Sequence, residues 1–310
     1  MITVDAAPIV YPFLNPLTDF SFKHLFGTDA NKDLLISFLN ALFKGEKKIV
    51  DVTYRPTEHT GDEETFKKVY FDIACTTDNG EHLIIEMQRE KQQHFRDRCV
   101  FYLSRSIQKQ IAAGGRWKKP LAGVYVIALM DFKLADSEAG SYLQDIALMN
   151  KDTAKLFYIK LGFKFIELPC FNKTEAELET DLDKWLYILK NMGKLTQVPV
   201  SLRKGVYFKF FQEAELIKMS KIEREIYDSN WKSYNDYLNT IDFAAMEARK
   251  KGMAKGIAKG KIEGKVEGIA EERRKNGIIT AKKLKKERVS MEIISKVTGL
   301  PIPEIEKLHE

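Results

Sequence analysis

One segment of the chain, residues 71–88 with the sequence FDIACTTDNGEHLIIEMQ, constrains the fold more than any other. Apolar residues fill its two halves, and Asp78-Asn79-Gly80 between them favours a tight turn between antiparallel strands. The segment therefore predicts a β-hairpin that lies in the core. It also contains Asp72 and Glu86, and a buried carboxylate is costly unless it has a partner.

The register of this hairpin decides whether the two acids meet. A two-residue loop would place Asp72 and Glu86 on opposite faces of the sheet. A three-residue loop would set Asp72 directly opposite Glu86, with Gly80 in the left-handed conformation of a bulge. Their Cβ atoms would then lie about 4.5–5.5 Å apart, and Gln88 would share their face because strand side chains alternate.

Two carboxylates this close repel each other, and a divalent cation between them removes the repulsion. Mg²⁺ prefers a few carboxylates and keeps several water ligands, one of which can attack a phosphate. The Gln88 amide is placed to orient such a water. The alternative is that the two acids lie on a solvated face of the sheet, or that Asp72 pairs with a lysine.

Periodicity along the rest of the chain predicts a mixed α/β sheet with helices packed against it. The pattern is helical again after residue 174. The predicted helices are 17–26, 30–43 and 92–112, and the predicted strands are 48–55, 66–76, 81–88, 121–130, 142–149 and 155–168.

Three scattered cysteines without a CxxC pair and five histidines without HxH or HxxxH spacing argue against a structural zinc site. One cysteine must stay unpaired, which fits a reducing cytoplasm. No run approaches 18 apolar residues, and the N-terminal residues have no basic segment followed by an apolar one. We therefore expect no membrane span, no signal peptide and a cytoplasmic location.

Glycine recurs at every fourth position from Gly252 to Gly268. Five glycines inside a helix would cost about 4–5 kcal/mol relative to alanine, so a lone helix here would be marginal. Either a partner helix packs along the glycine stripe, in another copy of the chain for instance, or the segment is a flexible spacer. Residues 290–308 predict two short helices about a turn at Gly299, as a helix-turn-helix-like module or as a small packing appendage.

The net charge of +6 is concentrated at the C-terminus, where residues 249–310 hold 17 Lys and Arg against 9 Asp and Glu. Such a segment can bind nucleic-acid phosphates, or it can simply form a solvated helix face. We expect a nuclease-like domain over 1–243, with a core at about 15–170 and a helical part at about 174–243. A glycine-patterned basic segment at 244–275 and a small helical module at 276–310 would follow.

Several motifs together resemble the Rpn family of recombination-promoting nucleases, transposases of the PD-(D/E)XK nuclease superfamily. The resemblance rests on TDFSFKHLFG (18–27), NKDLLISFLNALF (31–43), the hairpin at 71–88, FRDRCVFYLSR (95–105) and the terminal VTGLPIPEIEKL after the glycine repeat. It implies a restriction-endonuclease-like fold, followed here by a helical C-terminal region, that acts on DNA with Mg²⁺ or Mn²⁺.

The resemblance also implies roles for residues of the hairpin. The acids that bind metal in this superfamily correspond to Asp72 and Glu86, and the superfamily lysine corresponds to Gln88. Glutamine is neutral and cannot stabilise the developing phosphate charge as an ammonium would, although it can bind the attacking water. Lys23 or Arg98 is our candidate for the missing positive charge.

Two further elements carry candidates. Asp19 matches an acid that the superfamily often takes from its first helix, although Thr18-Asp19 at a helix start is also ordinary capping. Arg98 and Tyr102 lie four residues apart on one helix face, and the family pattern directs such a pair to the site. A structural role, with Arg98 pairing an acid and Tyr102 packing beneath it, explains them equally well.

These observations predict a metal-dependent DNA endonuclease that hydrolyses phosphodiester bonds with low sequence specificity, linked to recombination or transposition. The alternative is a catalytically weak DNA-binding or oligomerisation protein that retains the nuclease fold. Gln88 in place of lysine motivates it, as does the glycine stripe, through which two copies could associate.

Overall fold

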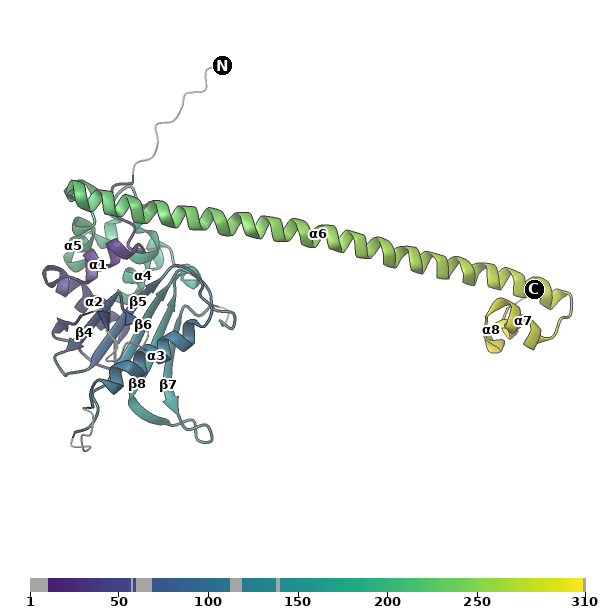
Figure 1. The fold of residues 1–310 in the computed structure, drawn as a ribbon, viewed down its shortest axis with the longest axis horizontal. Helices are drawn as coiled ribbons and strands as arrows, with labels where there is room; N and C mark the ends of the chain where they lie inside the picture. Colours follow the sequence, from purple (N-terminus) through teal and green to yellow (C-terminus); the bar gives the residue numbers. More distant parts are fainter. Residues whose placement is uncertain (1–10, 57, 60–68, 112–118, 138–139, 309–310) are drawn as a thin grey trace, which may run out of the picture. The chain divides into compact units, whose positions relative to one another are not determined.

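A computed structural model describes residues 11–56, 58–59, 69–111, 119–137 and 140–308 (Figure 1). The chain forms two compact units, Met1–Ser233 and Tyr234–Glu310, each with a hydrophobic core of its own. The N-terminal ten residues, the start of the strand predicted at 66–76 and the end of the helix predicted at 92–112 lie outside the described residues.

A six-stranded mixed sheet organises the first unit, with the strand order β1-β4-β5-β6-β8-β7. β5 pairs with β6 and β6 with β8 in parallel, whereas the other neighbours are antiparallel. This confirms the mixed α/β sheet. The strands are β1 (Val52–Tyr54), β4 (Ile73–Thr77), β5 (His82–Gln88), β6 (Val124–Met130), β7 (Leu143–Met149) and β8 (Leu156–Glu167), with a separate pair of β2 (Glu58–His59) and β3 (Val69–Tyr70).

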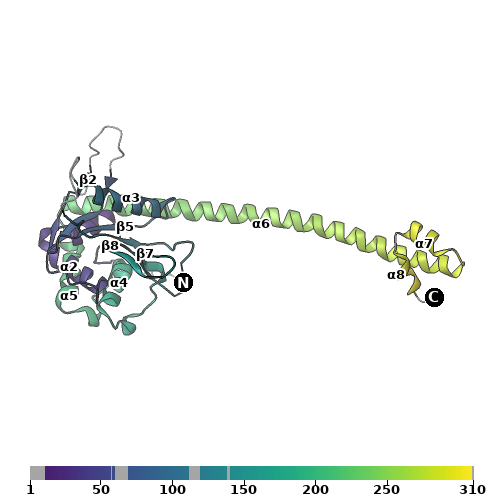
Figure 2. The ribbon, with the colours of Figure 1, turned by 90° about the horizontal axis from the view of Figure 1, so that it is seen from below.

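Helices cover both faces of this sheet, as Figure 2 shows, with α3 on one side and α2, α4 and α5 on the other. The two faces have different cores. Along β5, Leu83, Ile85 and Met87 pack with the group of helices, whereas Ile84 packs with α3. The helices are α1 (Asp19–Phe26), α2 (Lys32–Leu42), α3 (Phe95–Gln108), α4 (Asp181–Asn191) and α5 (Gly205–Glu213), with single 3-10 turns at Asp29–Asn31, Leu168–Cys170, Glu175–Glu177, Met192–Lys194, Val200–Leu202 and Leu216–Lys218.

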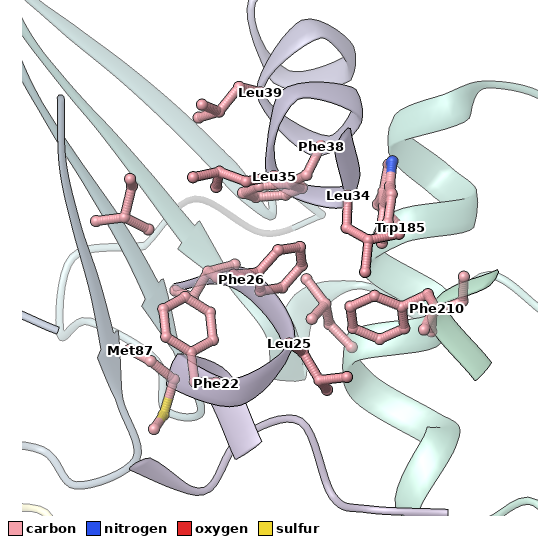
Figure 3. Packing of buried hydrophobic residues seen from close by; sticks show 14 of the residues in the cluster. Phe22, Leu25, Phe26, Leu34, Leu35, Phe38, Leu39, Met87, Trp185 and Phe210 are labelled. Atoms are coloured by element: carbon pink, nitrogen blue, oxygen red, sulfur yellow. The ribbon is translucent and has the colours of Figure 1, made fainter. Parts of the chain in front are cut away.

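Aromatic packing fixes the position of α1. The Phe26 ring centroid lies 5.1 Å from that of Phe210 on α5 and 5.8 Å from that of Trp185 on α4 (Figure 3). Phe22 and Leu25 on the same helix are also fully buried. Burial of side chains of this size stabilises the fold by roughly 1.5–3 kcal/mol each, so α1 is held firmly against α4 and α5.

The strand predicted at 48–55 is too long. β1 begins only at Val52, because side chains already satisfy the backbone of the residues before it. The Asn40 side chain accepts from the Ile49 N–H and donates to the Ile49 carbonyl, both at 2.8 Å. A carboxylate oxygen of Asp78 accepts from the Val50 N–H at 3.0 Å. These backbone groups are therefore already used and cannot join a ladder.

The prediction of one strand at 66–76 is also wrong, because β3 and β4 are separate strands. Phe71 and Asp72 separate the two strands. Here a carboxylate oxygen of Asp72, instead of a backbone carbonyl, accepts the hydrogen bond from the Met87 N–H. The strands predicted at 81–88, 121–130, 142–149 and 155–168 are confirmed to within a few residues by β5, β6, β7 and β8.

The glycine repeat is helical throughout and is not a flexible spacer. It lies within α6 (Lys221–Lys286), and a Cβ added at any of the five glycines from Gly252 to Gly268 would meet no other atom within 4 Å. The stripe is thus exposed in the described part of the chain. Among the described helices, α6 included, none has the apolar length needed to cross a membrane.

The predicted pair of short C-terminal helices is confirmed by α7 (Met291–Thr298) and α8 (Ile302–Glu306). Gly299 adopts a left-handed φ of 73° and ends α7, as a glycine at this position allows. Ile294, Leu300 and Ile305 bury themselves against Ala281 near the end of α6. The Lys285 ammonium group donates to the carbonyls of the last residues of α8, so these hydrogen bonds fasten the end of α8 to α6.

Candidate active site

The hairpin of β4 and β5 has the three-residue loop that brings the two acids together. Ile73 pairs with Ile85, and Thr76 with His82. The Thr77 N–H donates to the Glu81 carbonyl at 2.9 Å, and Gly80 has a φ of 77° in the left-handed region. The same register carried one residue further sets Asp72 opposite Glu86. Of the two registers that the sequence left open, the structure therefore has the three-residue one.

The hydrogen-bond pattern of the ladder places the acids where side chains come closest. Because residues 77 and 81 form a hydrogen-bonded pair, alternation makes Asp72 and Glu86 a non-hydrogen-bonded pair, for which opposed Cα atoms are only about 4.5 Å apart. Asp72 Oδ2 accepts from the Met87 N–H at 2.7 Å, in the position where the ladder would otherwise use a backbone carbonyl. The carboxylate of Asp72 is thus anchored to the opposite strand.

Glu86 is one of the charged residues that are buried in the sheet. It lies on the face of β5 that α3 covers, and the residue is only 2% exposed. Its Oε2 accepts from Gln88 Nε2 at 3.2 Å, whereas its Oε1 is buried and has no hydrogen-bond partner among the described residues. A buried polar group without a partner costs about 1–3 kcal/mol, and more when it is charged, so a positive or donating group beside Oε1 would stabilise the fold.

Burial raises the pKa of both carboxyls. For Asp72 the hydrogen bond from Met87 and the charge of Lys23 oppose the rise. For Glu86 the neighbouring Asp72 charge raises the pKa further, and the Arg98 charge lowers it. Two acids that resist ionisation in this way gain most from a divalent cation, which favours the charged form of both.

The start of α1 brings Asp19 and Lys23 to the same region. Thr18 caps the helix by accepting from the Ser21 N–H, and Asp19 forms an ion pair of 2.7 Å with Lys23 one turn later. The charges of Asp19 and Lys23 act in opposite directions on the pKa of Asp72. Both side chains are about half exposed, so they lie at the solvent side of the buried pair.

Arg98 and Tyr102 approach the pair from α3. The Arg98 guanidinium donates to the Tyr102 hydroxyl oxygen through Nη2 at 2.7 Å and Nε at 3.1 Å. The ring of Tyr102 packs edge-on against Phe71 with centroids 5.0 Å apart. The positive charge of Arg98 lowers the pKa of both Asp72 and Glu86. The two residues therefore combine a packing contact with an electrostatic effect on the acids.

The sequence interpretation missed two groups at this site. The Met87 N–H holds Asp72 in place, and the buried Cys99 thiol lies near enough to Glu86 for that charge to add to the effect of burial, which raises the Cys99 pKa to about 12. Helical spacing from Phe95 and Tyr102 would have placed Cys99 on the face toward the sheet. The Met87 N–H is a backbone donor, and no sequence pattern marks it in the same way.

A divalent cation fits this arrangement as a partner of two carboxylates. Within the ranges that the structure describes, no group of three or more His, Cys, Asp and Glu side chains is arranged to hold a metal. Asp72 and Glu86 would supply the acidic ligands, and the unpaired Glu86 Oε1 would gain a partner. Mg²⁺ suits such a sparse set, because it keeps water ligands and shares phosphate oxygens with a substrate.

Comparison with known sequences gives one family. Residues 16–244 match the sequence model of a family described as PD-(D/E)XK nuclease family transposase. No significant match was found among curated proteins or among solved structures. The matched segment contains every residue that we discuss at the hairpin, on α1 and on α3.

Proposed function

Because the chain belongs to the family of PD-(D/E)XK nuclease transposases, with a restriction-endonuclease-like sheet, we propose that it is a metal-dependent DNA endonuclease that hydrolyses phosphodiester bonds. The observation that carries this proposal is Glu86, a carboxylate buried opposite Asp72 with one oxygen unpaired. A purely structural acid would be expected to have its hydrogen bonds satisfied.

Asp72 and Glu86 would hold Mg²⁺ or Mn²⁺, which when bound supplies positive charge to the phosphate and lowers the pKa of a bound water. The Met87 N–H fixes Asp72 for this role. Gln88 already donates to Glu86, so it orients that carboxylate, and its amide carbonyl can accept from the attacking water.

Arg98 would supply positive charge in place of the missing lysine of the (D/E)xK pattern. Its charge lowers the pKa of both acids, and its two hydrogen bonds to Tyr102 hold the guanidinium group in one orientation. Lys23 is the second cation, although its ion pair with Asp19 reduces the charge that it offers. Asp19 would assist by positioning Lys23 or an outer water.

DNA would bind with little sequence preference, because a basic helix contacts phosphates rather than base edges. The C-terminal excess of lysine and arginine supports this part of the proposal. We propose a cytoplasmic role in recombination or transposition, following the family. The exposed glycine stripe of α6 is one candidate surface for self-association of the same enzyme.

Cleavage of supercoiled plasmid in Mg²⁺ tests the proposed function. Asp72→Asn should reduce the rate at least about 100-fold, because the loss of a metal ligand removes several kcal/mol of transition-state stabilisation. The asparagine can still accept from the Met87 N–H, so the fold should persist. Asp152→Asn, which removes an exposed acid in the β7–β8 turn, is the matched control and should cleave at the wild-type rate.

A second function from a different class has its own support. The neutral Gln88 is a weaker group for phosphate chemistry than lysine, which favours a protein that binds DNA without cutting it. Binding to plasmid with no nicking in Mg²⁺, Mn²⁺ or Co²⁺ would establish this alternative and exclude the enzyme.

A further inference from the structure

The hairpin of β7 and β8 extends beyond the rest of the sheet. β6 pairs only with Leu161–Glu167 of β8, so residues 156–160 have β7 on one side and no strand on the other among the described residues. β7 is the last strand in the sheet order. Figure 1 shows this two-stranded end running past the neighbouring strands. A two-stranded ribbon is marginally stable in water without a surface to pack on.

The side chains of this ribbon are apolar on both faces. The hairpin patch, as we call it, consists of Leu148, Met149, Leu156, Phe157 and Ile159. Phe157 is 73% exposed and Ile159 is 70% exposed. Antiparallel strands that face water on one side normally alternate between apolar and polar residues, and LFYIKL at 156–161 does not. The ribbon is therefore built for a contact that the described chain does not make.

An apolar groove continues the patch. Arg96 and Val100 of α3 line it together with Ile146, Phe163 and Phe165 of the two strands, and its volume is about 260 Å³. The groove adjoins the patch along both strands, because Ile146 precedes Leu148 on β7 and Phe163 follows Ile159 on β8. Groove and patch are thus consecutive parts of the same hairpin within the first unit.

We propose that this ribbon and the groove form the contact between two copies of the chain. Over both faces of the ribbon, the five patch side chains expose on the order of 600 Å² per copy, so a second copy that packs on both faces and on the groove would bury nearly the ~800 Å² per partner of a standard-size interface. None of the five is charged, so two copies can bring the same patch together about a twofold axis without repulsion.

The residues around the patch also fit a second copy of the chain as its partner. Lys151, Asp152 and Lys155 in the connecting turn form a polar rim about an apolar centre, as at protein–protein interfaces. DNA fits this surface less well, because the five side chains of the patch are uncharged and Arg96 in the groove is already paired with Asp136. Register shifts between Ala147 and Met149 distort the outer edge of β7, so the contact is made by side chains rather than by a continuous ladder.

Sizing of the intact chain by light scattering tests the proposal. The wild type should be a dimer at micromolar concentration. The double variant Phe157→Ser/Ile159→Ser should be a monomer, with the dissociation constant raised at least about 100-fold, because each copy loses two large buried side chains. Both positions are exposed in one chain, so the circular dichroism spectrum should stay that of the wild type, and the melting temperature should fall only by the stabilisation that dimer formation provides.

Two controls separate this surface from the alternatives. Ile217→Ser removes a 90% exposed apolar side chain outside the patch and should leave the dimer intact. Gly260→Leu places a bulky side chain on the glycine stripe of α6 and should leave it intact as well. A monomeric wild type, a double variant that remains dimeric, or a Gly260→Leu variant that dissociates would each overturn the proposal. The outcome does not depend on nuclease activity.

Discussion

Asp72 and Glu86 hold their protons more tightly in the folded protein than in the unfolded chain, because burial raises the pKa of each. The folded state therefore binds more protons than the unfolded state above about pH 4, where both acids start to ionise when unfolded. It follows that the pair makes the free energy of unfolding decrease as pH rises from about 4 through the raised pKa values. A bound cation would cancel this loss.

The melting temperature should show this linkage. Without divalent metal, the wild type should lose stability between pH 5 and pH 8 more steeply than Asp72→Asn/Glu86→Gln, in which neither side chain ionises. Mg²⁺ should raise the melting temperature by about 5–10 °C at pH 8, at a concentration about 100 times its dissociation constant. The increase should be smaller at pH 5, where protons compete. A metal effect that persists in the double variant would place the ion elsewhere.

At the scale of elements, the turn between β4 and β5 sets the register that the site requires. Gly80 has a left-handed φ of 77°, which residues with a side chain adopt only at a cost of about 1–2 kcal/mol. Gly80→Ala should therefore lower the free energy of unfolding by about that amount, measured in urea. Gly80→Asn should lower it less, because asparagine tolerates this conformation. Equal losses in the two variants would show that φ is not the cause.

Local sequence patterns predicted most of these elements. The apolar run of β5, the turn at Asp78-Asn79-Gly80 and the helical spacing of α1 and α3 are all readable from neighbouring residues. The sequence left two registers open for the hairpin, and only the structure selects the one that pairs Asp72 with Glu86. The predicted strand at 48–55 was too long because Asn40 bonds both backbone groups of Ile49, nine residues further along the chain. At Phe71-Asp72, between β3 and β4, the Asp72 side chain accepts from the Met87 N–H. The spacing of apolar residues in the sequence gives no sign of such a bond.

At the scale of the whole molecule, the net charge of the C-terminal unit supports DNA binding. Lys282, Lys283 and Lys286 near the end of α6 are exposed, whereas Lys285 donates to the carbonyls at the end of α8. Changing the three exposed lysines to glutamine should weaken DNA binding without loss of fold. The slope of log K against log salt should fall by up to about 0.9 for each phosphate that a lysine no longer neutralises.

Lys285→Gln provides the comparison, since it removes one positive charge from the same stretch of α6. We expect it to destabilise the packing of α8, with little change in the salt slope for DNA. A triple variant with an unchanged slope would show that these lysines form only a solvated helix face. The sequence left these alternatives open because it gives the charge of the tail but not which lysines are already bonded within it.

The most direct test of the metal site is a crystal of the protein soaked in Mn²⁺, with diffraction measured at a wavelength where manganese scatters anomalously. We predict one anomalous peak within about 2.0–2.5 Å of an oxygen of Asp72 and an oxygen of Glu86, and no such peak in Glu86→Gln. A peak bound to other residues, or none beside this pair at millimolar Mn²⁺, would contradict the proposed metal centre.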